Sequence, residues 1–382
     1  MASKIKILYT IDNLFGMNGG GTERHLYNLT TYLDSNKFEC LIVAFDTGKT
    51  LLTDLIQRKT RIIHLPVQKF YSPNAFIQAC KFIKIIKDFN PDIYQSFHFK
   101  SDTYGVLIAK IAGCRHIVSS RRDLGLNKKG YHFLLNRIFN NFIDQFIVVS
   151  NSVGKFIMLK EKVPSNKIYT IYNGVDKDYF KKPSIDKIYS LRRNYNIDNN
   201  DVIFGMVAVF RQEKRHDLIL RAFRTALNYC KNIKLFFVGG GPLLDLYKEK
   251  CLKSGLGSTV LFSGAVSDVK PYLSMFDVGC LLSDTEGFSN AIIEKMAFGL
   301  PIIASGKGGN LEAISNGING YLVSNDDINQ LTKIIIELAT NKEKRIHMGI
   351  NSRKIVETKF SLRTMIDNYE KYYTNLVSRL NS

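Results

Sequence analysis

The sequence predicts an α/β protein made of two similar halves, each built on a mainly parallel sheet. Short apolar runs typical of buried strands alternate with helical patterns, and this alternation starts again at Val202. A glycine-rich turn leads into a helix in each half, ending at Gly21 in the first and beginning at Gly239 in the second. The chain has 382 residues, whereas a single hydrophobic core stops growing at roughly 250–300 residues. Repeated strand–helix units covered on both faces favour parallel sheets.

The first half opens with a strand and a possible phosphate site. Strands are expected at residues 4–11, 40–45, 61–65, 93–97, 116–120, 145–150 and 167–172, with helices from Thr22 and at 74–89, 126–142 and 151–160. In the turn before Thr22, Gly20 and Gly21 lack side chains, so their backbone N–H groups can approach an anion closely. Asp46 follows the second strand, where a dinucleotide-binding fold places a ribose-binding acid. The glycine spacing is not G-x-G-x-x-G, so we interpret Asp46 as an ordinary residue at the end of a strand and not as a ribose-binding acid.

Two polar residues follow later strands of this half. His98 comes directly after strand 93–97, and Arg122 lies just beyond strand 116–120. Open α/β sheets bind ligands at the carboxyl ends of their strands, and on this ground we favour a functional role for His98. Asn173 begins the sequence N-G-V-D, which turns out of the sheet into a polar, proline-bearing stretch typical of a linker.

The second half carries cations after its first strand. Strands are expected at 202–209, 235–238, 260–263, 278–282, 302–304 and 319–323, with helices from Asp217 and at 328–339, 342–358 and 361–380. Arg211 and Lys214 stand at the carboxyl edge of strand 202–209, where they can neutralise a diphosphate and make it a better leaving group. Arg215, beside them, is expected to be solvated. Gly240 and Val266 lie in the turns after the next two strands.

The stretch from Leu281 to Ser305 is the most informative part of the chain. It predicts a strand, a loop with Glu286, a helix with Glu294, and another strand; Gly299 and Pro301 end the helix. The first turn of that helix, at Phe288, Ser289 and Asn290, presents the positive end of the helix dipole to a phosphate. Carboxylates on both sides of a phosphate site suit a sugar nucleotide, which has hydroxyl groups on both sides of its phosphates. Two solvated surface glutamates explain the same pattern when it is taken alone.

Composition restricts the class of partner. The formal net charge is +19 at pH 7, which favours nucleic acid, phosphorylated substrates or an anionic membrane surface. The positive charges are spread over helices and loops without a recognisable nucleic-acid module, so nucleic acid is disfavoured. The segment 126–142 mixes basic and aromatic residues around an apolar helical face, which suits an interfacial helix on anionic lipid, although core packing explains that face equally well.

The cysteines and the amino-terminal sequence point to the cytosol. The six cysteines are scattered without a C-x-x-C pair, so neither a disulfide framework nor a zinc site is indicated. No apolar run reaches the roughly 18–20 residues needed to span a bilayer. The first residues show no secretory pattern. We therefore expect a cytoplasmic protein, at the inner face of the cell membrane if it binds lipid.

With these residues in place, the chain resembles the retaining glycosyltransferases of family 4, the group 1 glycosyl transferases, over nearly its full length. The most specific motif is E-G-F-S-N-A-I-I-E, which holds the family's two glutamates. The motifs G-G-G-T-E-R, N-G-V-D, V-G-G-G-P, G-G-N-L-E and N-G-I-N-G-Y-L-V occur in the expected order around it. One departure concerns the family's arginine: five residues before Lys214 stands Val209, and the nearest arginine is Arg211.

The resemblance implies a fold and a division of roles. The fold would be GT-B: two facing Rossmann-like domains, residues 1–176 and 201–360, with a linker at 177–200 and a deep cleft between them. The helix at 361–382 would pack back toward the amino-terminal, acceptor-binding domain. Among the catalytic residues, Glu286 would hold the transferred sugar, His98 would face it, and Arg211 and Lys214 would grip the diphosphate. The donor-binding residues would be Glu294, on the ribose, with Phe288, Ser289, Asn290, Gly20, Gly21, Gly240 and Val266; Arg122 and Asn173 would bind the acceptor.

The implied reaction moves a hexosyl or N-acetylhexosaminyl group from a UDP- or GDP-sugar to a hydroxyl of a growing cell-surface glycan, with retention of configuration. The acceptor is expected to be lipid-linked, the donor is a substrate, and neither a cofactor nor a metal is expected. A sugar-nucleotide 2-epimerase of related fold is a close alternative. A nicotinamide-dependent oxidoreductase, supported by the first glycine turn and Asp46, leaves the glutamate pair unexplained.

Overall fold

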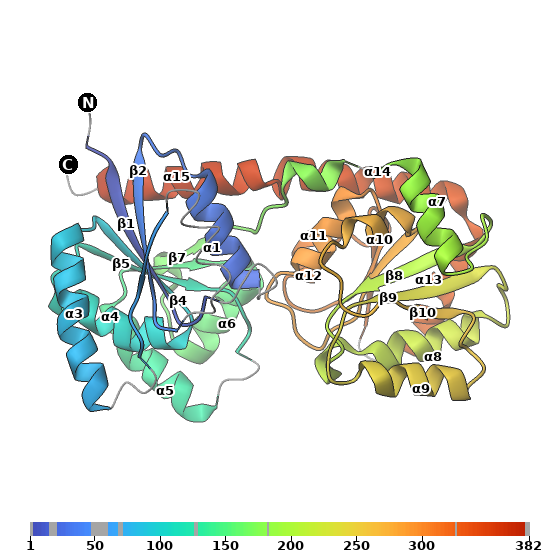
Figure 1. Cartoon of the computed structure of the whole chain (residues 1–382), viewed down its shortest axis with the longest axis horizontal. Helices are drawn as coiled ribbons and strands as arrows, with labels where there is room; N and C mark the ends of the chain where they lie inside the picture. Colours follow the sequence, from blue (N-terminus) through green and yellow to red (C-terminus); the bar gives the residue numbers. More distant parts are fainter. Residues whose placement is uncertain are drawn as a thin grey trace. The chain divides into compact units, whose positions relative to one another are not determined.

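The computed structural model describes residues 3–14, 21–46, 60–67, 72–125, 129–181, 183–324 and 327–378. The chain folds into two compact units (Figure 1). The first unit comprises residues up to Asn173 and from Arg363 onward, and the second comprises Gly174–Leu362. The second unit is therefore inserted, in sequence, between two segments of the first.

The first unit is a parallel sheet in the order β3-β2-β1-β4-β5-β6-β7. The strands are β1 (Ile5–Ile11), β2 (Phe38–Ala44), β3 (Arg61–His64), β4 (Ile93–Phe97), β5 (His116–Arg121), β6 (Gln145–Val148) and β7 (Ile168–Thr170). The helices are α1 (Gly21–Tyr32), α3 (Pro73–Phe89), α4 (Val106–Ile111), α5 (Gly130–Phe139), α6 (Asn151–Glu161) and α15 (Leu362–Ser378), with a π-helix at Ser101–Gly105. The strand order reverses between β1 and β4, which makes their carboxyl ends the ligand-binding edge of this sheet.

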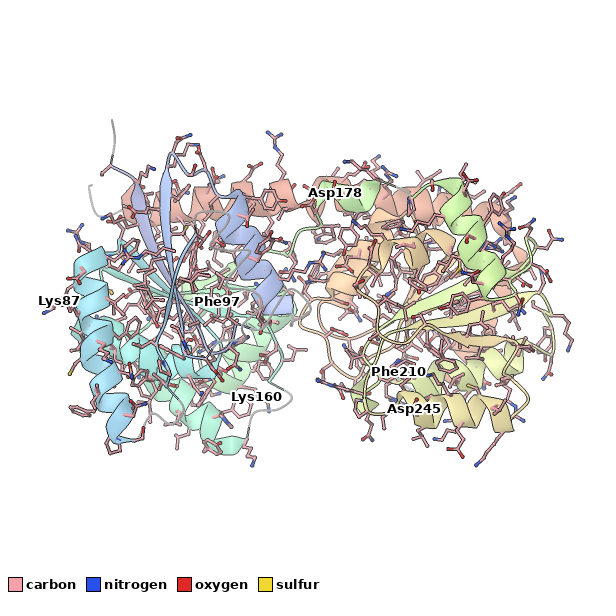
Figure 2. The ribbon with its side chains drawn as sticks, viewed as in Figure 1. Lys87, Phe97, Lys160, Asp178, Phe210 and Asp245 are labelled. Carbon is pink, nitrogen blue, oxygen red and sulfur yellow. The ribbon has the colours of Figure 1, made fainter. Side chains whose placement is uncertain are left out.

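The core of this unit depends on α15, which follows the second unit in the chain. The Tyr373 hydroxyl donates to Oε1 of Gln95 on β4 at 2.6 Å, and the Tyr9 hydroxyl on β1 donates to that of Tyr373 at 3.1 Å. The hydroxyl of Tyr369 lies 3.0 Å from Nε2 of His25 on α1. Figure 2 shows Phe97, at the end of β4, among the side chains that fill this unit.

The second unit is a parallel sheet in the order β10-β9-β8-β11-β12-β13. The strands are β8 (Val202–Val207), β9 (Ile233–Val238), β10 (Val260–Phe262), β11 (Val278–Leu281), β12 (Ile302–Ser305) and β13 (Gly320–Val323). The helices are α7 (Ile185–Asn194), α8 (His216–Ala226), α9 (Leu244–Lys253), α10 (Lys270–Met275), α11 (Asn290–Ala297), α12 (Asn310–Ala313), α13 (Ile328–Thr340) and α14 (Lys342–Lys359). Numbered along this unit, the order is that of the Rossmann fold, with its reversal between β8 and β11.

In the segment 177–200, predicted to be a linker, the described residues form regular elements, and the segment belongs to the second unit. It contains a 3₁₀ turn (Lys177–Phe180) and α7, which packs on α10. The ring of Tyr195 lies edge-on to that of Phe236 in β9, with centroids 4.7 Å apart. Tyr179 and Ile197 are buried, so a few apolar anchors hold an otherwise polar segment against the unit.

The helix predicted at 126–142 begins later than expected. Residues 126–128 lie outside the described residues, and α5 starts at Gly130. Among the residues that the structure describes, no helix combines the length and the apolar content required to cross a membrane.

Candidate functional site

A lysine and a glutamate meet where the strand order of the second unit reverses. Lys214 lies in the loop after β8 and Glu286 in the loop after the neighbouring strand β11. The Nζ of Lys214 donates to Oε1 of Glu286 at 2.5 Å, and the Ser283 hydroxyl donates to the same oxygen at 2.8 Å. The side chains are 24% and 12% exposed, so the pair is partly shielded from water and still open to a ligand.

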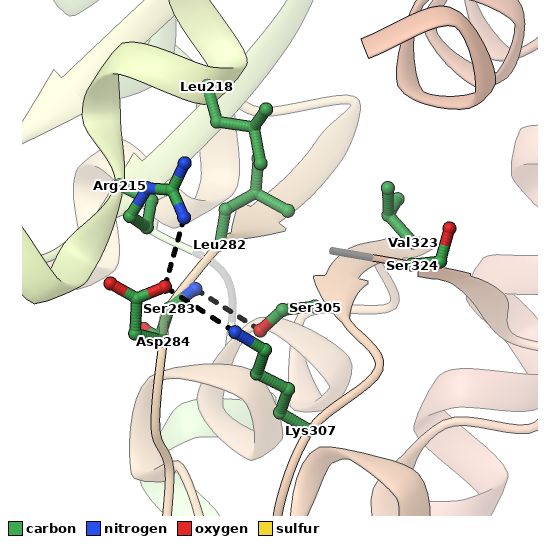
Figure 3. Close-up of a pocket in the computed structure, with 9 residues that line it drawn as sticks. All are labelled: Arg215, Leu218, Leu282, Ser283, Asp284, Ser305, Lys307, Val323 and Ser324. Carbon is green, nitrogen blue, oxygen red and sulfur yellow. Dashed lines mark hydrogen bonds and ion pairs between the residues drawn. The ribbon is translucent and has the colours of Figure 1, made fainter. Parts of the chain in front are cut away.

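Further ion pairs tie the loops of this edge together. Figure 3 shows Asp284 between two cations: Nη1 of Arg215 lies 3.0 Å and Nζ of Lys307 lies 3.5 Å from its Oδ1. The Asp284 N–H also donates to the carbonyl of Glu213 at 2.9 Å. The cavity beside them has a volume of about 10 Å³, room for about one water molecule. This cavity is a small gap between loops and not a substrate pocket.

The loop carrying Glu286 is fixed by a close backbone approach. The Gly309 N–H donates to the Glu286 carbonyl at 3.1 Å. A Cβ at position 309 would lie 2.3 Å from the Gly287 carbonyl oxygen and 2.9 Å from the Phe288 Cα. Only glycine fits here, so the motif G-K-G-G-N holds the motif E-G-F-S-N in place.

Helix α11 begins next to the Lys214–Glu286 pair and carries Glu294. Ser289 stands at its N-cap and Asn290 begins the helix, while the Phe288 ring packs on Phe360 with centroids 5.1 Å apart. Ile292, Ile293 and Met296 are buried beneath the helix, and Glu294 is only 7% exposed. The structure thus brings the start of a helix, one cation and two carboxylates to one edge of the sheet.

The turns after β9 and β10 border the same edge. Gly239 and Gly241 have φ angles of 148° and 142°, which favour glycine. The carbonyl of Gly240 accepts the N–H of Phe210 at 2.8 Å, joining this turn to the loop after β8. Val266, in the turn after β10, is partly exposed.

The two arginines of the loop after β8 have different surroundings, and the expectation that Arg215 is solvated is wrong. Arg215, predicted to be solvated, is 20% exposed and pairs with Asp284. Arg211, predicted to grip the diphosphate, is exposed, and its side chain makes no hydrogen bond or ion pair with another described residue. The physical reason lies in the backbone: Arg215 takes a left-handed φ of 44° before α8 and lies beside the β11 loop.

In the first unit, His98 occupies a strained turn at the end of β4. Its φ is 75°, which is uncommon for a residue with a Cβ, and strained backbone of this kind clusters at functional sites. Asp12, after β1, accepts the N–H groups of Lys100 at 2.8 Å and Ser101 at 2.7 Å. Burial raises the pKa of Asp12, and the nearby His98 charge and these hydrogen bonds oppose the shift. Of the two predicted glycines, Gly20 lies outside the described residues and Gly21 begins α1.

Arg122 and Asn173, both predicted to bind the acceptor, are brought together. The guanidinium of Arg122 donates to Oδ1 of Asn173. Burial is the main cause that lowers the pKa of Arg122, while Tyr369 and Glu23 act in the opposite direction. A positive charge is therefore held by neighbours from α1, from α15 and from the segment after β7.

Sequence reasoning missed a buried charge network beside Arg122. Arg121 pairs with Asp102, in the π-helix, and with Glu161 at 3.3 Å; all three residues are at most 5% exposed. Asp102 also accepts hydroxyl hydrogen bonds from Ser96 and Ser119, both at 2.6 Å. The available signal was the alternation of a strand: consecutive side chains at the end of β5 point to opposite faces of the sheet, so Arg121 and Arg122 could be expected to have different neighbours.

The described residues contain no cluster of three or more histidine, cysteine, aspartate or glutamate side chains that could hold a metal ion.

Two family models match the chain. Residues 188–355 match "Glycosyl transferases group 1", and residues 19–179 match "Glycosyltransferase Family 4". The N-acetyl-alpha-D-glucosaminyl L-malate synthase of Bacillus anthracis is 27% identical over 312 residues, which cover 80% of this chain and 81% of the relative. A UDP-Gal:alpha-D-GlcNAc-diphosphoundecaprenol alpha-1,3-galactosyltransferase of Escherichia coli is 24% identical over 369 residues, 90% of this chain and 91% of the relative.

Solved structures share the fold. A glycosyltransferase from Rickettsia africae has a TM-score of 0.86 at 22% identity, covering 98% of this chain and 99% of that one. HepE of Anabaena, solved in complex with UDP and glucose, has a TM-score of 0.82 at 21% identity, covering 97% of this chain and 100% of that one.

Two Rossmann-like units and these structural neighbours define a protein of the GT-B fold class, as the sequence predicted. Within that class, the chain belongs to the group 1 glycosyl transferases of glycosyltransferase family 4. It is a glycosyltransferase.

Proposed function

We propose that the protein transfers a hexosyl or N-acetylhexosaminyl group from a UDP- or GDP-sugar to a hydroxyl of a cell-surface glycan, with retention of configuration. The observation that carries this proposal is the Lys214–Glu286 pair beside the start of α11, at the reversal point of the second sheet. The proposal is supported by a relative named for a diphosphoundecaprenol-linked sugar, by one named for capsular polysaccharide biosynthesis, and by a structural neighbour solved in complex with UDP.

The proposed roles follow from charge and position. Glu294 accepts hydrogen bonds from the ribose hydroxyls, and Glu286 orients the sugar. Lys214 neutralises the diphosphate together with backbone N–H groups at Phe288, Ser289 and Asn290, because a helix start favours an anion. Arg211 has a side chain free to swing onto the phosphates, and Gly240 and Val266 border the nucleotide.

The proposed chemistry is a displacement at the anomeric carbon. The bond from that carbon to the diphosphate oxygen breaks while the acceptor oxygen bonds to the same face. Attack on the face that the phosphate leaves gives retention without a covalent nucleophile, and the departing phosphate takes the acceptor proton, so no side chain is required as a general base. Lys214 stabilises the charge that develops on the leaving oxygen, a task for which other transferases use a metal ion. His98 faces the sugar, and Arg122 and Asn173 bind the acceptor.

A thermal-shift screen of UDP-, GDP- and ADP-sugars tests donor binding, because a bound ligand raises the melting temperature by mass action. We expect one nucleotide class to stabilise the wild type and to lose this effect in Glu294→Ala. Failure of every nucleotide to shift the wild-type melting temperature would contradict the proposal.

Product analysis separates the proposed reaction from its alternatives. Incubation of the selected donor without acceptor distinguishes a transferase from a 2-epimerase, which would invert the sugar at C2 under these conditions. With an acceptor, the NMR coupling of the product's anomeric proton reports retention. Turnover that survives a chelator would support metal independence.

We also propose that α5 and α6 bind an anionic membrane surface at the cytoplasmic face. Tyr131, Leu134 and Ile138, spaced three and four residues apart on α5, are 55%, 59% and 50% exposed. Leu159 on the neighbouring α6 is 70% exposed. The exposed basic residues around them are Lys129, Arg137, Lys155, Lys160 and Lys162. Apolar side chains within a basic rim suit an interface with anionic lipid.

Flotation with vesicles that contain anionic lipid tests this surface. The wild type should float at low salt, and the double variant Leu134→Glu/Ile138→Glu should not. Leu252→Glu is the matched control, because Leu252 is 74% exposed on α9 of the other unit. Equal flotation of all three proteins, or none by the wild type, would contradict the assignment.

A further inference from the structure

A buried carboxylate lies directly after the turn of His98. Asp102 belongs to the π-helix Ser101–Gly105, and its side chain is 3% exposed. Its N–H donates to the His98 carbonyl at 3.0 Å, so the backbone of Asp102 contacts the strained turn directly. A π-helical turn is rare and occurs frequently at functional sites. The conformation of His98 therefore depends on where Asp102 is held.

The side chain of Asp102 joins this turn to two strands. Its Oδ1 accepts hydrogen bonds from the hydroxyl groups of Ser96 on β4 and Ser119 on β5, both at 2.6 Å. Nη1 of Arg121, the last residue of β5, donates to its Oδ2. Ser96 and Ser119 are paired in the register of the sheet. The carboxylate thus bridges two neighbouring strands close to the point where β4 ends and the His98 turn begins.

Asp12 and Tyr94 hold the same π-helix from other strands. Asp12, after β1, accepts hydrogen bonds from the N–H of Lys100 at 2.8 Å and from the N–H and the hydroxyl of Ser101 at 2.7 and 2.8 Å. The Tyr94 hydroxyl on β4 donates to the Ser101 carbonyl at 3.2 Å. A Cβ at Gly105 would lie 2.3 Å from that hydroxyl oxygen. The π-helix is therefore fixed at its beginning by hydrogen bonds and at its end by close packing.

The charges around Asp102 supply geometry more than stability. Arg121 also pairs with Glu161 at 3.3 Å and donates to Oδ1 of Asn140 at 2.9 Å. Replacing buried ion pairs by apolar residues of similar volume is often neutral or stabilising, because desolvation of the charges offsets their attraction. Charge-assisted hydrogen bonds, however, have directional preferences that apolar contacts lack. A buried network at the ends of two strands is therefore suited to fixing the direction of the chain that follows.

We propose that Asp102, paired with Arg121, is a positioning residue that holds His98 in its strained conformation toward the sugar. This role rests on the proposed function, in which His98 faces the transferred sugar. Asp102 and Arg121 are buried and act through the backbone of the turn. Without the pair, the turn would relax toward an ordinary φ and carry the imidazole away. A displacement of about 1 Å at the reacting centre can lower turnover by about 100-fold.

A network without charges tests this role. The triple variant Asp102→Leu/Arg121→Met/Glu161→Gln removes all three charges at once, so that none of them stays buried without its partner. Ile7→Val is the control, because it lowers the stability of the same unit by truncating a buried side chain near the beginning of β1. Release of UDP from the UDP-sugar that the thermal-shift screen selects, or of GDP from a GDP-sugar, gives kcat and the donor KM.

The split between kcat and KM separates positioning from packing. We expect kcat of the triple variant to fall by more than about tenfold. The donor KM and the affinity for the free nucleotide should stay at their wild-type values, because the second unit, which is proposed to hold the nucleotide, is unchanged. Ile7→Val should keep the wild-type kcat. A merely structural network would lower the melting temperature of the triple variant and leave its kcat unchanged.

A second readout asks whether the network acts through His98. His98→Ala alone should lower kcat, and adding it to the triple variant should cost little more, because both changes act through the same imidazole. Losses of kcat that multiply would show that the network acts elsewhere, and they would overturn the role. Full turnover in His98→Ala would overturn it as well.

Each remaining outcome identifies which proposal fails. A wild-type kcat in the folded triple variant overturns the positioning role and leaves the proposed function standing. If the triple variant does not fold, Arg121→Lys decides, because lysine keeps the charge and lacks the planar fork of donors; a wild-type kcat in Arg121→Lys then overturns the role. A wild type that binds no nucleotide, or that releases none from any sugar nucleotide of the screen, overturns the proposed function and, with it, this inference.

Discussion

The ammonium of Lys214 lies 2.5 Å from Oε1 of Glu286, although 72 positions separate the two residues in the chain. They meet because β8 and β11 are neighbours in the sheet and both strands end at the same edge. The pair joins the group that would bind phosphate to the group that would hold the sugar, so nucleotide binding and sugar transfer should be separable by substitution.

Lys214→Met and Glu286→Gln should have opposite effects on nucleotide affinity. We expect Lys214→Met to weaken UDP or GDP binding by about tenfold or more, because the phosphates lose a charge-assisted contact. Glu286→Gln removes a negative charge beside the phosphates, so nucleotide affinity should be kept or increased while turnover is lost. Calorimetry and a transfer assay measure the two quantities. Equal loss of affinity in both variants would show that the pair acts as one structural unit.

Gly309→Ala should damage the site through the backbone. The Gly309 φ of −66° is ordinary, so the cost is purely steric: the new methyl group meets the Gly287 carbonyl oxygen. We expect a loss of about 1–3 kcal/mol in the free energy of unfolding and weaker nucleotide binding. Gly257→Ala is the control, since its Cβ would meet only the Leu252 Cδ1, at 3.5 Å. Matching stability of the two variants would refute the close approach.

His98→Gly should be more stable than His98→Ala. The residue has a φ of 75°, which glycine adopts without strain and alanine does not. The difference in the free energy of unfolding should be about 1 kcal/mol, measured by urea denaturation. Both variants lose the imidazole, so both should lose turnover if His98 faces the sugar. Equal stability would mean that the turn is unstrained, and full turnover would remove His98 from the site.

His216 should make the protein acid-sensitive. Its ring stacks on Phe210 with centroids 4.1 Å apart, and neither nitrogen has a hydrogen-bond partner among the described residues. Burial lowers the pKa of His216 to about 4, whereas the unfolded chain protonates near 6.5. As the pH falls from about 6.5 toward 4, His216 becomes protonated in the unfolded state but stays neutral in the folded state. The free energy of unfolding should fall by up to about 3 kcal/mol over this range.

His216→Phe keeps the stacking and removes the titration. Urea unfolding at pH 7, 6 and 5 should therefore show a smaller loss of stability in the variant than in the wild type. The carboxylates titrate alike in both proteins, so the difference isolates His216. Parallel pH profiles would contradict the assignment.

The fold was predictable because strand-length apolar runs and glycine-rich turns report local geometry directly. The position of Lys214 and of Glu286 at the carboxyl edge of the sheet followed from the same logic, since both residues stand just after a strand, but their ion pair was not predicted. Which arginine is paired was not predictable: Arg211 and Arg215 are four positions apart, and their environments depend on the left-handed turn at Arg215. The burial of Lys295 was not predicted either, because the space for its side chain comes from Gly279 on another element, which has no side chain.

The segment 177–200 shows why composition misled. Its polar and charged residues are typical of a linker, yet stability there depends on single anchors such as Tyr195 against Phe236. When hydrophobicity is averaged over a window of sequence, a single apolar anchor among polar residues has little effect on the average. The buried Arg121–Asp102–Glu161 network was missed for the opposite reason, since charges far apart in the sequence compensate one another only after folding.

The place of α15 in the chain has a consequence for biosynthesis. The ribosome makes the whole of Gly174–Leu362 before it makes the tyrosines that close the core of the other unit. Until Tyr369 and Tyr373 emerge, the nascent sheet around Gln95 and Tyr9 is left with an uncovered apolar face that chaperones or misfolded neighbours can reach. The second unit can fold as soon as its own residues have been made, whereas the first unit can complete its core only after residue 373 has been translated.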